Sequence, residues 1–262
     1  MKKIAVLIDY SEGCKKSLQQ ARILSELTGA SIHAVYVAMD VEVDVEDLML
    51  SAFVTENIGT AIPITTHVLD GALLQSLSIG LNAIHPDLIV LCTHGVQGIV
   101  QHLFGARVLK LVQSVPCSFV VVQENSVIDE KGFQRILFPA THREDADLLI
   151  DRVMNVAAEC DSEVVFYEIE KYFAGAEADI KNNFEKAKKL FDSRGIRFSH
   201  VKEQQNNHSL GYARQILDYA DSNGIGLIAT LSQVVETGTL LMKSDKEALI
   251  TNARGIPILS CG

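Results

Sequence analysis

Tryptophan is absent from this sequence of 262 residues, and aromatic residues make up only 6% of it. Hydrophobic residues nevertheless account for 48%, so most of the apolar content is aliphatic. This composition is typical of compact α/β proteins, and it excludes a disordered chain, which has too few apolar residues to form a core. A chain of this length accommodates one large domain or two of about 130 residues.

An excess of positive charge is also lacking. The formal net charge is −10, with 7 basic against 12 acidic residues in 1–124 and 16 against 21 in 125–262. Nucleic acids and anionic membrane surfaces bind to basic patches, so neither is expected as a partner. A small anion held by backbone N–H groups is still compatible, because such a site depends on local geometry rather than on net charge.

Paired cysteines and long apolar runs are missing as well. The cysteines are Cys14, Cys92, Cys117, Cys160 and Cys261. Their number is odd and no two are spaced as CxxC, which excludes a disulfide framework. Asp9 interrupts the apolar start of the chain before the hydrophobic region of a signal peptide could form. No stretch approaches the ~18–20 apolar residues that span a bilayer, so we expect a cytoplasmic protein.

The sequence does contain a series of continuous apolar, β-branched segments with helical patterns between them. In the first half we expect strands near 3–8, 31–37, 62–69, 87–92 and 118–123. Helices are predicted at 11–28, 46–58, 71–85 and 105–115. Strands that are apolar without alternation are buried on both faces of a parallel sheet. The pattern therefore predicts a doubly wound α/β fold with right-handed crossovers.

The order of elements begins again after a polar segment at 124–133. At a constant shift of 132 residues, Leu18 aligns with Ile150 and Ile32 with Val164, and at a shift of 141 Pro116 aligns with Pro257. Any two β-α-β stretches can be superposed by chance, but agreement at both ends of the unit favours a duplication. We therefore predict two domains, 1–124 and 134–262, each with a five-stranded parallel sheet and joined by this linker.

The last predicted strand of each domain is apolar and would leave an exposed, adhesive edge. We expect these strands, 118–122 and 256–261, to pair antiparallel with each other and to form an internal pseudo-dimer. At the same time we expect the two sheets to be separate rather than one continuous sheet.

Ligands of open α/β sheets bind beyond the carboxyl ends of the strands. In this sequence the residues at those positions are 9–13, 37–39 and 92–105. Gly105 opens a predicted helix and lets backbone N–H groups face an anion without a Cβ in the way, and Gly95 does the same at the strand end.

These segments resemble the universal stress protein family, whose ATP-binding members carry G-x2-G-x9-G-(S/T) between the fourth strand and the fourth helix. Gly95-x9-Gly105 matches this spacing, Thr93-His94-Gly95 is similar to the family's THG, and Leu7-Ile8-Asp9-Tyr10-Ser11-Glu12 is similar to its P-x-D-x-S-E opening. The resemblance implies an adenine-nucleotide alpha hydrolase-like fold. It also implies that ATP or another adenine nucleotide binds in the first domain only, with Asp9 and Val37 near ribose and adenine and Gly95, Gly105, Ala106 and Arg107 near the phosphates.

The chain departs from the family motifs at three positions. Leu7 replaces the proline of the opening motif. Cys92 replaces the first glycine, which adds a side chain where the backbone would pass close to the ligand, and Ala106 replaces the Ser/Thr hydroxyl. Losing that hydroxyl weakens the binding free energy of the nucleotide by ~1 kcal/mol, or by ~1.5–3 kcal/mol if the lost hydrogen bond is to a charged group. The backbone donors remain, so weakened binding is expected. Arg107 is either a phosphate contact or a solvated side chain, His94 either positions phosphate or acts as a base, and Cys92 is either a reactive thiol or a buried small side chain.

The second half departs further. Thr141 stands where the first half has Asp9, His142 and Arg143 follow it, and Lys246 falls at the position of Gly105. No glycine opens that helix, so we expect its pocket to be closed and empty of nucleotide.

Two functions from different classes remain open. One is a stress-response regulator that binds an adenine nucleotide in domain 1. The other is a scaffold that acts through protein contacts or an unrelated small ligand. An ordinary enzyme is not expected beyond at most a weak ATPase, because the motifs supply no catalytic nucleophile-base pair and no metal cluster. His33 and His67 are expected on neighbouring strands as core or edge residues, and a homodimer is suggested by the resemblance.

Overall fold

A computed structural model describes residues 1–38, 43–93, 115, 117–143, 146–170, 175–205, 211–231 and 243–261. The first half contains β1 (Lys3–Leu7), α1 (Glu12–Thr28), β2 (Ser31–Ala38), α2 (Val43–Ile58), β3 (Ile64–Asp70), α3 (Leu73–Ile84), β4 (Leu88–Thr93) and β5 (Ser118–Gln123). The second contains β6 (Arg135–Pro139), α5 (Ala146–Cys160), β7 (Glu163–Glu170), α6 (Glu177–Ser193), β8 (Arg197–Gln204), α7 (Tyr212–Ser222), β9 (Leu227–Leu231), α8 (Lys243–Ile250) and β10 (Ile258–Cys261). Strands and helices alternate from β1 to β4 and from β6 to β10, as predicted.

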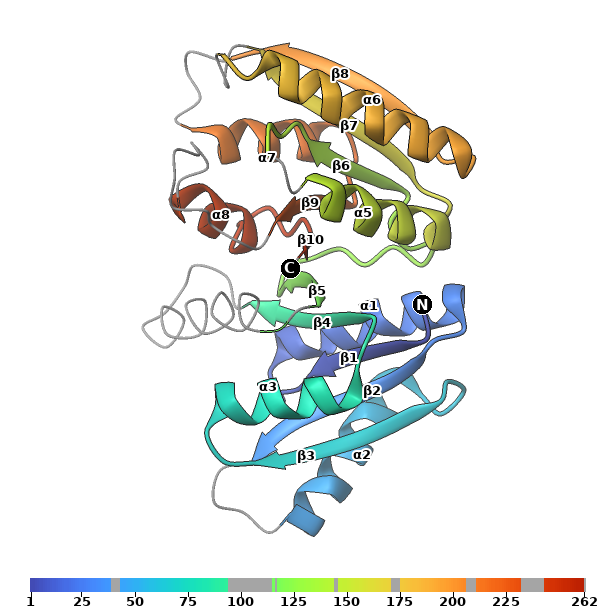
Figure 1. Cartoon of the computed structure of the whole chain (residues 1–262). Helices are drawn as coiled ribbons and strands as arrows, with labels where there is room; N and C mark the ends of the chain where they lie inside the picture. Colours follow the sequence, from blue (N-terminus) through green and yellow to red (C-terminus); the bar gives the residue numbers. More distant parts are fainter. Residues whose placement is uncertain are drawn as a thin grey trace.

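The strands form one ten-stranded sheet in the order β3-β2-β1-β4-β5-β10-β9-β6-β7-β8 (Figure 1). Five parallel strands come from each half, and β5 and β10 join the halves as the antiparallel pair of the sheet, with Leu259 opposite Val120. The predicted pairing of the last strands is confirmed. The expectation of two separate sheets is wrong, because pairing two edge strands by hydrogen bonds necessarily fuses the sheets to which they belong.

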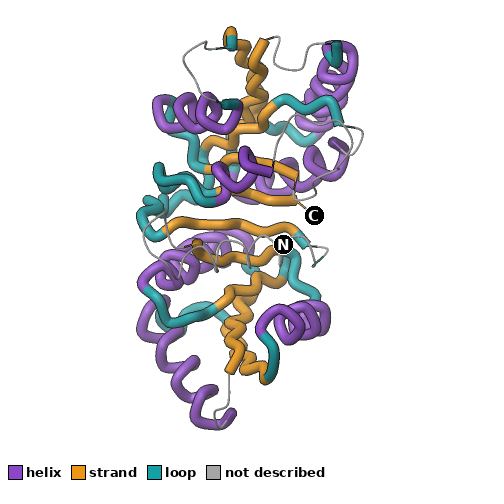
Figure 2. The backbone as a smooth tube through the Cα atoms, turned by 90° about the vertical axis from the view of Figure 1, so that its left-hand side faces the viewer, coloured by secondary structure: helices purple, strands orange, loops and turns teal. Residues whose placement is uncertain are grey.

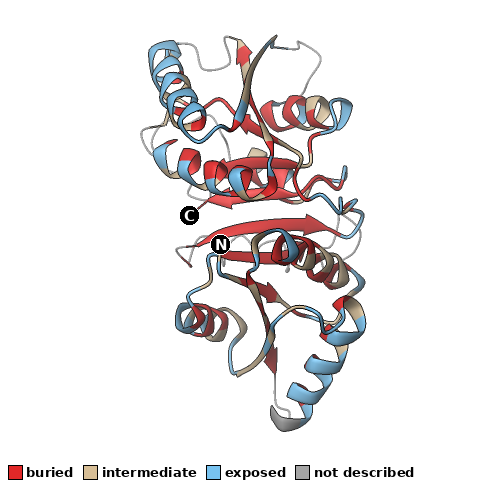
Figure 3. Ribbon diagram, turned by 90° about the vertical axis from the view of Figure 1, so that its right-hand side faces the viewer, coloured by how far each residue is buried: buried red, intermediate tan, exposed pale blue. Residues whose placement is uncertain are grey.

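Helices cover both faces of this sheet (Figure 2). All six residues of β4 and all six of β5 are buried, whereas the outermost strands β3 and β8 are mostly half-buried or exposed (Figure 3). This gradient explains why the central strands are continuous apolar runs in the sequence while Thr65, Thr66 and His67 occur in β3.

Helix α1 shows how local sequence sets the element boundaries. The Ser11 hydroxyl accepts a hydrogen bond from Cys14 N at 3.1 Å and caps the amino end. At the other end Gly29 adopts a left-handed conformation with φ +72° and donates to Ser25 O at 2.8 Å. The predicted apolar face is buried, with Leu18 and Leu24 both inaccessible to solvent.

Most of the other predicted boundaries agree within a few residues. Helix α2 begins at Val43 rather than at residue 46, and β3 begins at Ile64 because Pro63 has no N–H to donate to the ladder. The helix predicted at 105–115 lies outside the described residues.

The segment between β5 and β6 packs against the body of the protein. Ser126 is buried and its hydroxyl accepts from Gln123 N at 2.9 Å, while Asn125 Nδ2 donates to Ala253 O at 2.9 Å. Phe133 is also buried in the hydrophobic core, which extends through both halves. This polar connector, the segment between β5 and β6, therefore contributes to the seam, which is the contact between the two halves along β5 and β10.

Candidate functional site

Three of the predicted site residues lie at one edge of the sheet. Asp9 follows β1, Val37 is near the end of β2, and Cys92 is near the end of β4. These strands are neighbours in the order β2-β1-β4 and run parallel, so their carboxyl ends lie together. Their role in ligand binding stays a prediction. The remaining five residues, His94, Gly95, Gly105, Ala106 and Arg107, lie outside the described residues.

Asp9 is held in place by the start of α1. One carboxylate oxygen, Oδ1, accepts from Ser11 N at 3.0 Å and from the Ser11 hydroxyl at 2.6 Å. The same hydroxyl caps α1, so the carboxylate, the cap and the first helical turn form one connected unit. Asp9 is exposed, which places an oriented negative group at the edge of the sheet where a ribose hydroxyl could bind.

Sequence reasoning missed the aromatic side chains beside Asp9. Tyr10 has a left-handed backbone with φ +59°, and its ring packs 4.9 Å from that of Tyr36 and 5.1 Å from that of Phe53 between centroids. Its hydroxyl lies 3.5 Å from Glu46 Oε2. Burial, with Glu46 as a second cause, raises the pKa of Tyr10 to about 12. Tyr10 is therefore neutral near pH 7 and fixes the turn by packing.

Cys92 behaves as a small buried side chain. It is 8% exposed, and burial raises the pKa of its thiol, with the Asp9 carboxylate as the next contribution in the same direction. Because the thiolate is the nucleophilic form, a raised pKa argues against a reactive cysteine. The structure thus favours the second of the two interpretations of Cys92. All five cysteines are free and buried.

The ends of β4 and β5 are held by a carbonyl from the second half. Gln123 Nε2 donates to Ile250 O at 2.9 Å, and the Thr93 hydroxyl lies 3.4 Å from the same oxygen. Ile250 is the last residue of α8, whose final carbonyl groups have no partner within the helix. The second half therefore shapes the edge beside the first-half site.

The second half repeats the turn after β1 in altered form. The Thr141 hydroxyl accepts from Arg143 N at 3.2 Å, which corresponds to the bond between Asp9 and Ser11 N. Thr141 and Lys246 are 6% and 5% exposed and line a space of only about 20 Å³, roughly the room for one water. The space between these described residues is therefore small, and a closed site that is empty of nucleotide stays a prediction.

The histidine pair also lies where the sequence suggests. His33 Nδ1 and His67 Nε2 are 2.9 Å apart on neighbouring strands, and both side chains are half-buried. In the described part of the chain, no three His, Cys, Asp or Glu residues are grouped so that they could hold a metal ion. Within the same part, none of the helices is both long enough and apolar enough to span a membrane.

Comparison with known proteins connects this geometry to a family. Residues 1–123 match the model of the universal stress protein family. No curated protein matches the chain in sequence.

Solved structures match over nearly the full length of the chain. A universal stress protein from Archaeoglobus fulgidus DSM 4304 is 14% identical, with a TM-score of 0.70, covering 99% of this chain and 95% of that one. A protein of unknown function from Pseudomonas aeruginosa PAO1 is 14% identical, with a TM-score of 0.64 and coverage of 100% and 92%. The cytoplasmic domain of a prokaryotic cation chloride cotransporter is 9% identical, with a TM-score of 0.57 and coverage of 99% and 94%. Residues 1–123 therefore match the universal stress protein family, and the length and fold of the whole chain fit a tandem arrangement of two such units.

Proposed function

We propose that the protein is a stress-response regulator of the cytoplasm that binds an adenine nucleotide, of the ATP type, in its first half. The observation that carries the proposal is the oriented Asp9 carboxylate at the shared edge of β1, β2 and β4, within the half that matches the family. Gly95 and Gly105 at the family spacing add backbone donors for the phosphates. The nucleotide-dependent states would change which partner the protein binds.

The same proposal divides the chain into a binding domain, 1–124, and a degenerate domain, 134–262. The pseudo-symmetric turns support this division, because Asp9 and Thr141 accept equivalent backbone hydrogen bonds while only Asp9 carries a charge. One nucleotide per chain is therefore expected.

Calorimetric titration with ATP, together with mass spectrometry of nucleotide carried through purification, tests the proposal. Asp9→Ala should weaken binding about tenfold or more, because a hydrogen bond to a charged group contributes ~1.5–3 kcal/mol. Thr141→Ala is the matched control in the second half and should leave binding unchanged. Two nucleotides per chain, or equal effects of the two substitutions, would contradict the assignment.

A scaffold without nucleotide is the second candidate. Cys92 in place of glycine, the small second-half pocket and the occurrence of the same fold in a cotransporter's cytoplasmic domain favour it. Such a protein would act through protein contacts, including those of a homodimer, or through an unrelated small ligand. No co-purified nucleotide and no heat on titration with ATP would support this function over the first.

A further inference from the structure

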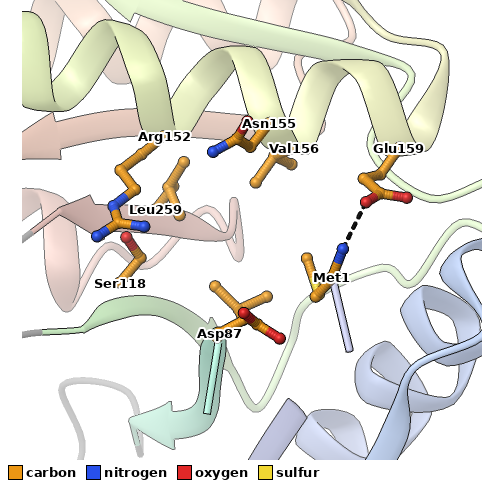
Figure 4. Close-up of a pocket in the computed structure, with 9 residues that line it drawn as sticks. Met1, Asp87, Ser118, Arg152, Asn155, Val156, Glu159 and Leu259 are labelled. Carbon is orange, nitrogen blue, oxygen red and sulfur yellow. Dashed lines mark hydrogen bonds and ion pairs between the residues drawn. The ribbon is translucent and has the colours of Figure 1, made fainter. Parts of the chain in front are cut away.

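A cavity of about 250 Å³ lies between the two halves, at the opposite strand ends from Asp9 and Cys92. From the first half it is lined by Asp87, which precedes β4, and by Ser118, the first residue of β5. Helix α5 covers it with Arg152, Asn155 and Glu159 (Figure 4). At ~30 Å³ per molecule of liquid water, the space corresponds to roughly eight waters, or a small organic molecule.

The Arg152 guanidinium has an unpaired nitrogen atom at this cavity. Its Nε atom is buried without a hydrogen-bond partner among the described residues. Figure 4 shows that, of the residues lining the cavity, Met1 and Glu159 form an ion pair, whereas Arg152 is joined to none of them. A buried donor left unpaired costs ~1–3 kcal/mol, so the arrangement favours an acceptor that enters from solvent.

Ser118 adds a second unsatisfied group on the same wall. It is 3% exposed, and its Oγ atom has no conventional hydrogen-bond partner in the part of the chain that the structure describes. The Ser118 side chain interacts with the buried Cys261 thiol, which is only a weak hydrogen-bonding group. An unpaired guanidinium nitrogen and a hydroxyl with only a weak thiol partner are both able to donate to a carboxylate.

Asp87 faces the cavity from the side opposite Arg152 (Figure 4). Its Oδ2 atom accepts from Lys2 N at 2.7 Å and from Lys3 N at 2.9 Å. Burial opposes ionisation, but these backbone hydrogen bonds, together with the positive charges of the N-terminal ammonium group and of Lys2, lower the pKa of Asp87. Besides the Met1–Glu159 ion pair, the cavity thus presents the positive Arg152 and the negative Asp87, which suits a ligand with both charges.

We propose that this cavity binds a small α-amino acid, with its carboxylate on Arg152 and Ser118 and its ammonium group toward Asp87. The apolar side chains of Leu88, Val156 and Leu259, which also line the cavity, would accommodate a short aliphatic side chain. Inorganic phosphate matches the positive wall but is repelled by Asp87. An amine without a carboxylate matches Asp87 but leaves Arg152 unpaired.

Calorimetry on the full chain with glycine, L-alanine, L-serine and L-valine tests this site, with acetate, ethylamine and phosphate as probes of each charge alone. At least one amino acid should bind at least tenfold more tightly than any of the single-charge probes. Arg152→Gln should weaken that binding at least tenfold, and Asp87→Asn should bring the amino acid and acetate close to equal affinity. Arg214→Gln, at an exposed arginine on α7, is the matched control and should have no effect.

Circular dichroism establishes that each variant is folded, and Arg152→Lys serves if Arg152→Gln is not. Lysine keeps the positive charge but cannot form bidentate hydrogen bonds to a carboxylate, so a partial loss of affinity is expected. The proposal is overturned if none of the four amino acids binds, which would indicate a cavity filled by water. Tighter binding of phosphate than of the amino acids, or unchanged binding by the Arg152 variants, overturns it as well.

Discussion

His33 and His67 lie side by side on β2 and β3, joined by a ring nitrogen contact of 2.9 Å that needs at least one neutral ring. Burial lowers the pKa of both, with the neighbouring His67 and Lys3 as further causes for His33, and with Lys3 lowering and Asp47 raising that of His67. The unfolded chain therefore binds more protons than the folded one once the pH falls below about 6.5. The stabilising contribution of the pair is present above that pH and is lost as the pH falls.

Urea unfolding at pH 7.5 and 5.5 measures this effect. The free energy of unfolding of the wild type should fall on acidification. That of the His67→Gln variant should fall less, because one titrating group is gone. His85→Asn, at an exposed histidine that ends α3, should keep the wild-type difference. A His67→Gln variant with the same pH dependence as the wild type would show that the pair does not control it.

The two substitutions of the glycine motif should act in opposite directions on nucleotide affinity. If the proposed nucleotide site exists, Gly105→Val would place a branched side chain against the phosphates and should abolish binding of ATP. Ala106→Ser restores a hydroxyl and should strengthen binding by ~1 kcal/mol, about fivefold. Calorimetry on both variants, with circular dichroism to verify the fold, provides the measurement. If neither the parent nor Ala106→Ser binds ATP, the scaffold function replaces the nucleotide-binding one.

The turn between α8 and β10 depends on a glycine. Gly255 has φ +70°, and a Cβ at this position would lie 2.8 Å from the backbone oxygen of Asn125 in the connector between β5 and β6. Gly255→Ala should therefore cost the ~1–2 kcal/mol of a left-handed backbone and an additional penalty for displacing the connector. Gly224→Ala is the control, because Gly224 has φ +63° with no atom within 4 Å of its Cβ.

Thermal unfolding compares the two glycine variants. At roughly 2–4 °C per kcal/mol for a chain of this size, Gly224→Ala should lower Tm by a few degrees and Gly255→Ala by clearly more. Equal shifts would mean that the connector moves aside without cost.

The elements themselves could be predicted because their signals are local. Ser11 and Gly29 mark the ends of α1, and continuous apolar runs mark the central strands. That Asp9, Val37 and Cys92 share an edge also follows from sequence, because the carboxyl ends of parallel strands meet there. The packing of Tyr10 on Tyr36 and Phe53 could not be predicted, since it depends on the left-handed turn at Tyr10 and on the position of α2.

Contacts between the halves could not be predicted from local sequence signals. The cavity between Asp87 and Arg152, and the bond from Gln123 to Ile250 O, join segments whose relative position is set by the β5–β10 pair. The duplication predicted that two units exist and that these strands meet. The side chains that face each other across the seam differ between the units, so symmetry alone could not identify them.

The pairing of β5 with β10 predicts how the first half would behave without the second. Every residue of β5 is buried, and Val120, opposite Leu259, is inaccessible to solvent. A fragment of residues 1–133 would lose β10 and expose a six-residue apolar edge, and exposed strands of this kind pair with another copy.

We expect this fragment to form a homodimer through β5, in which a second β5 replaces β10. Analytical ultracentrifugation should then find a dimer for the fragment, and Val120→Lys should shift it to monomer because each copy would bury an unpaired charge in the strand pair. A folded, monomeric fragment would show instead that β5 does not require a partner strand, and that the duplication serves the contacts of Ile250 and Arg152 rather than the protection of an edge.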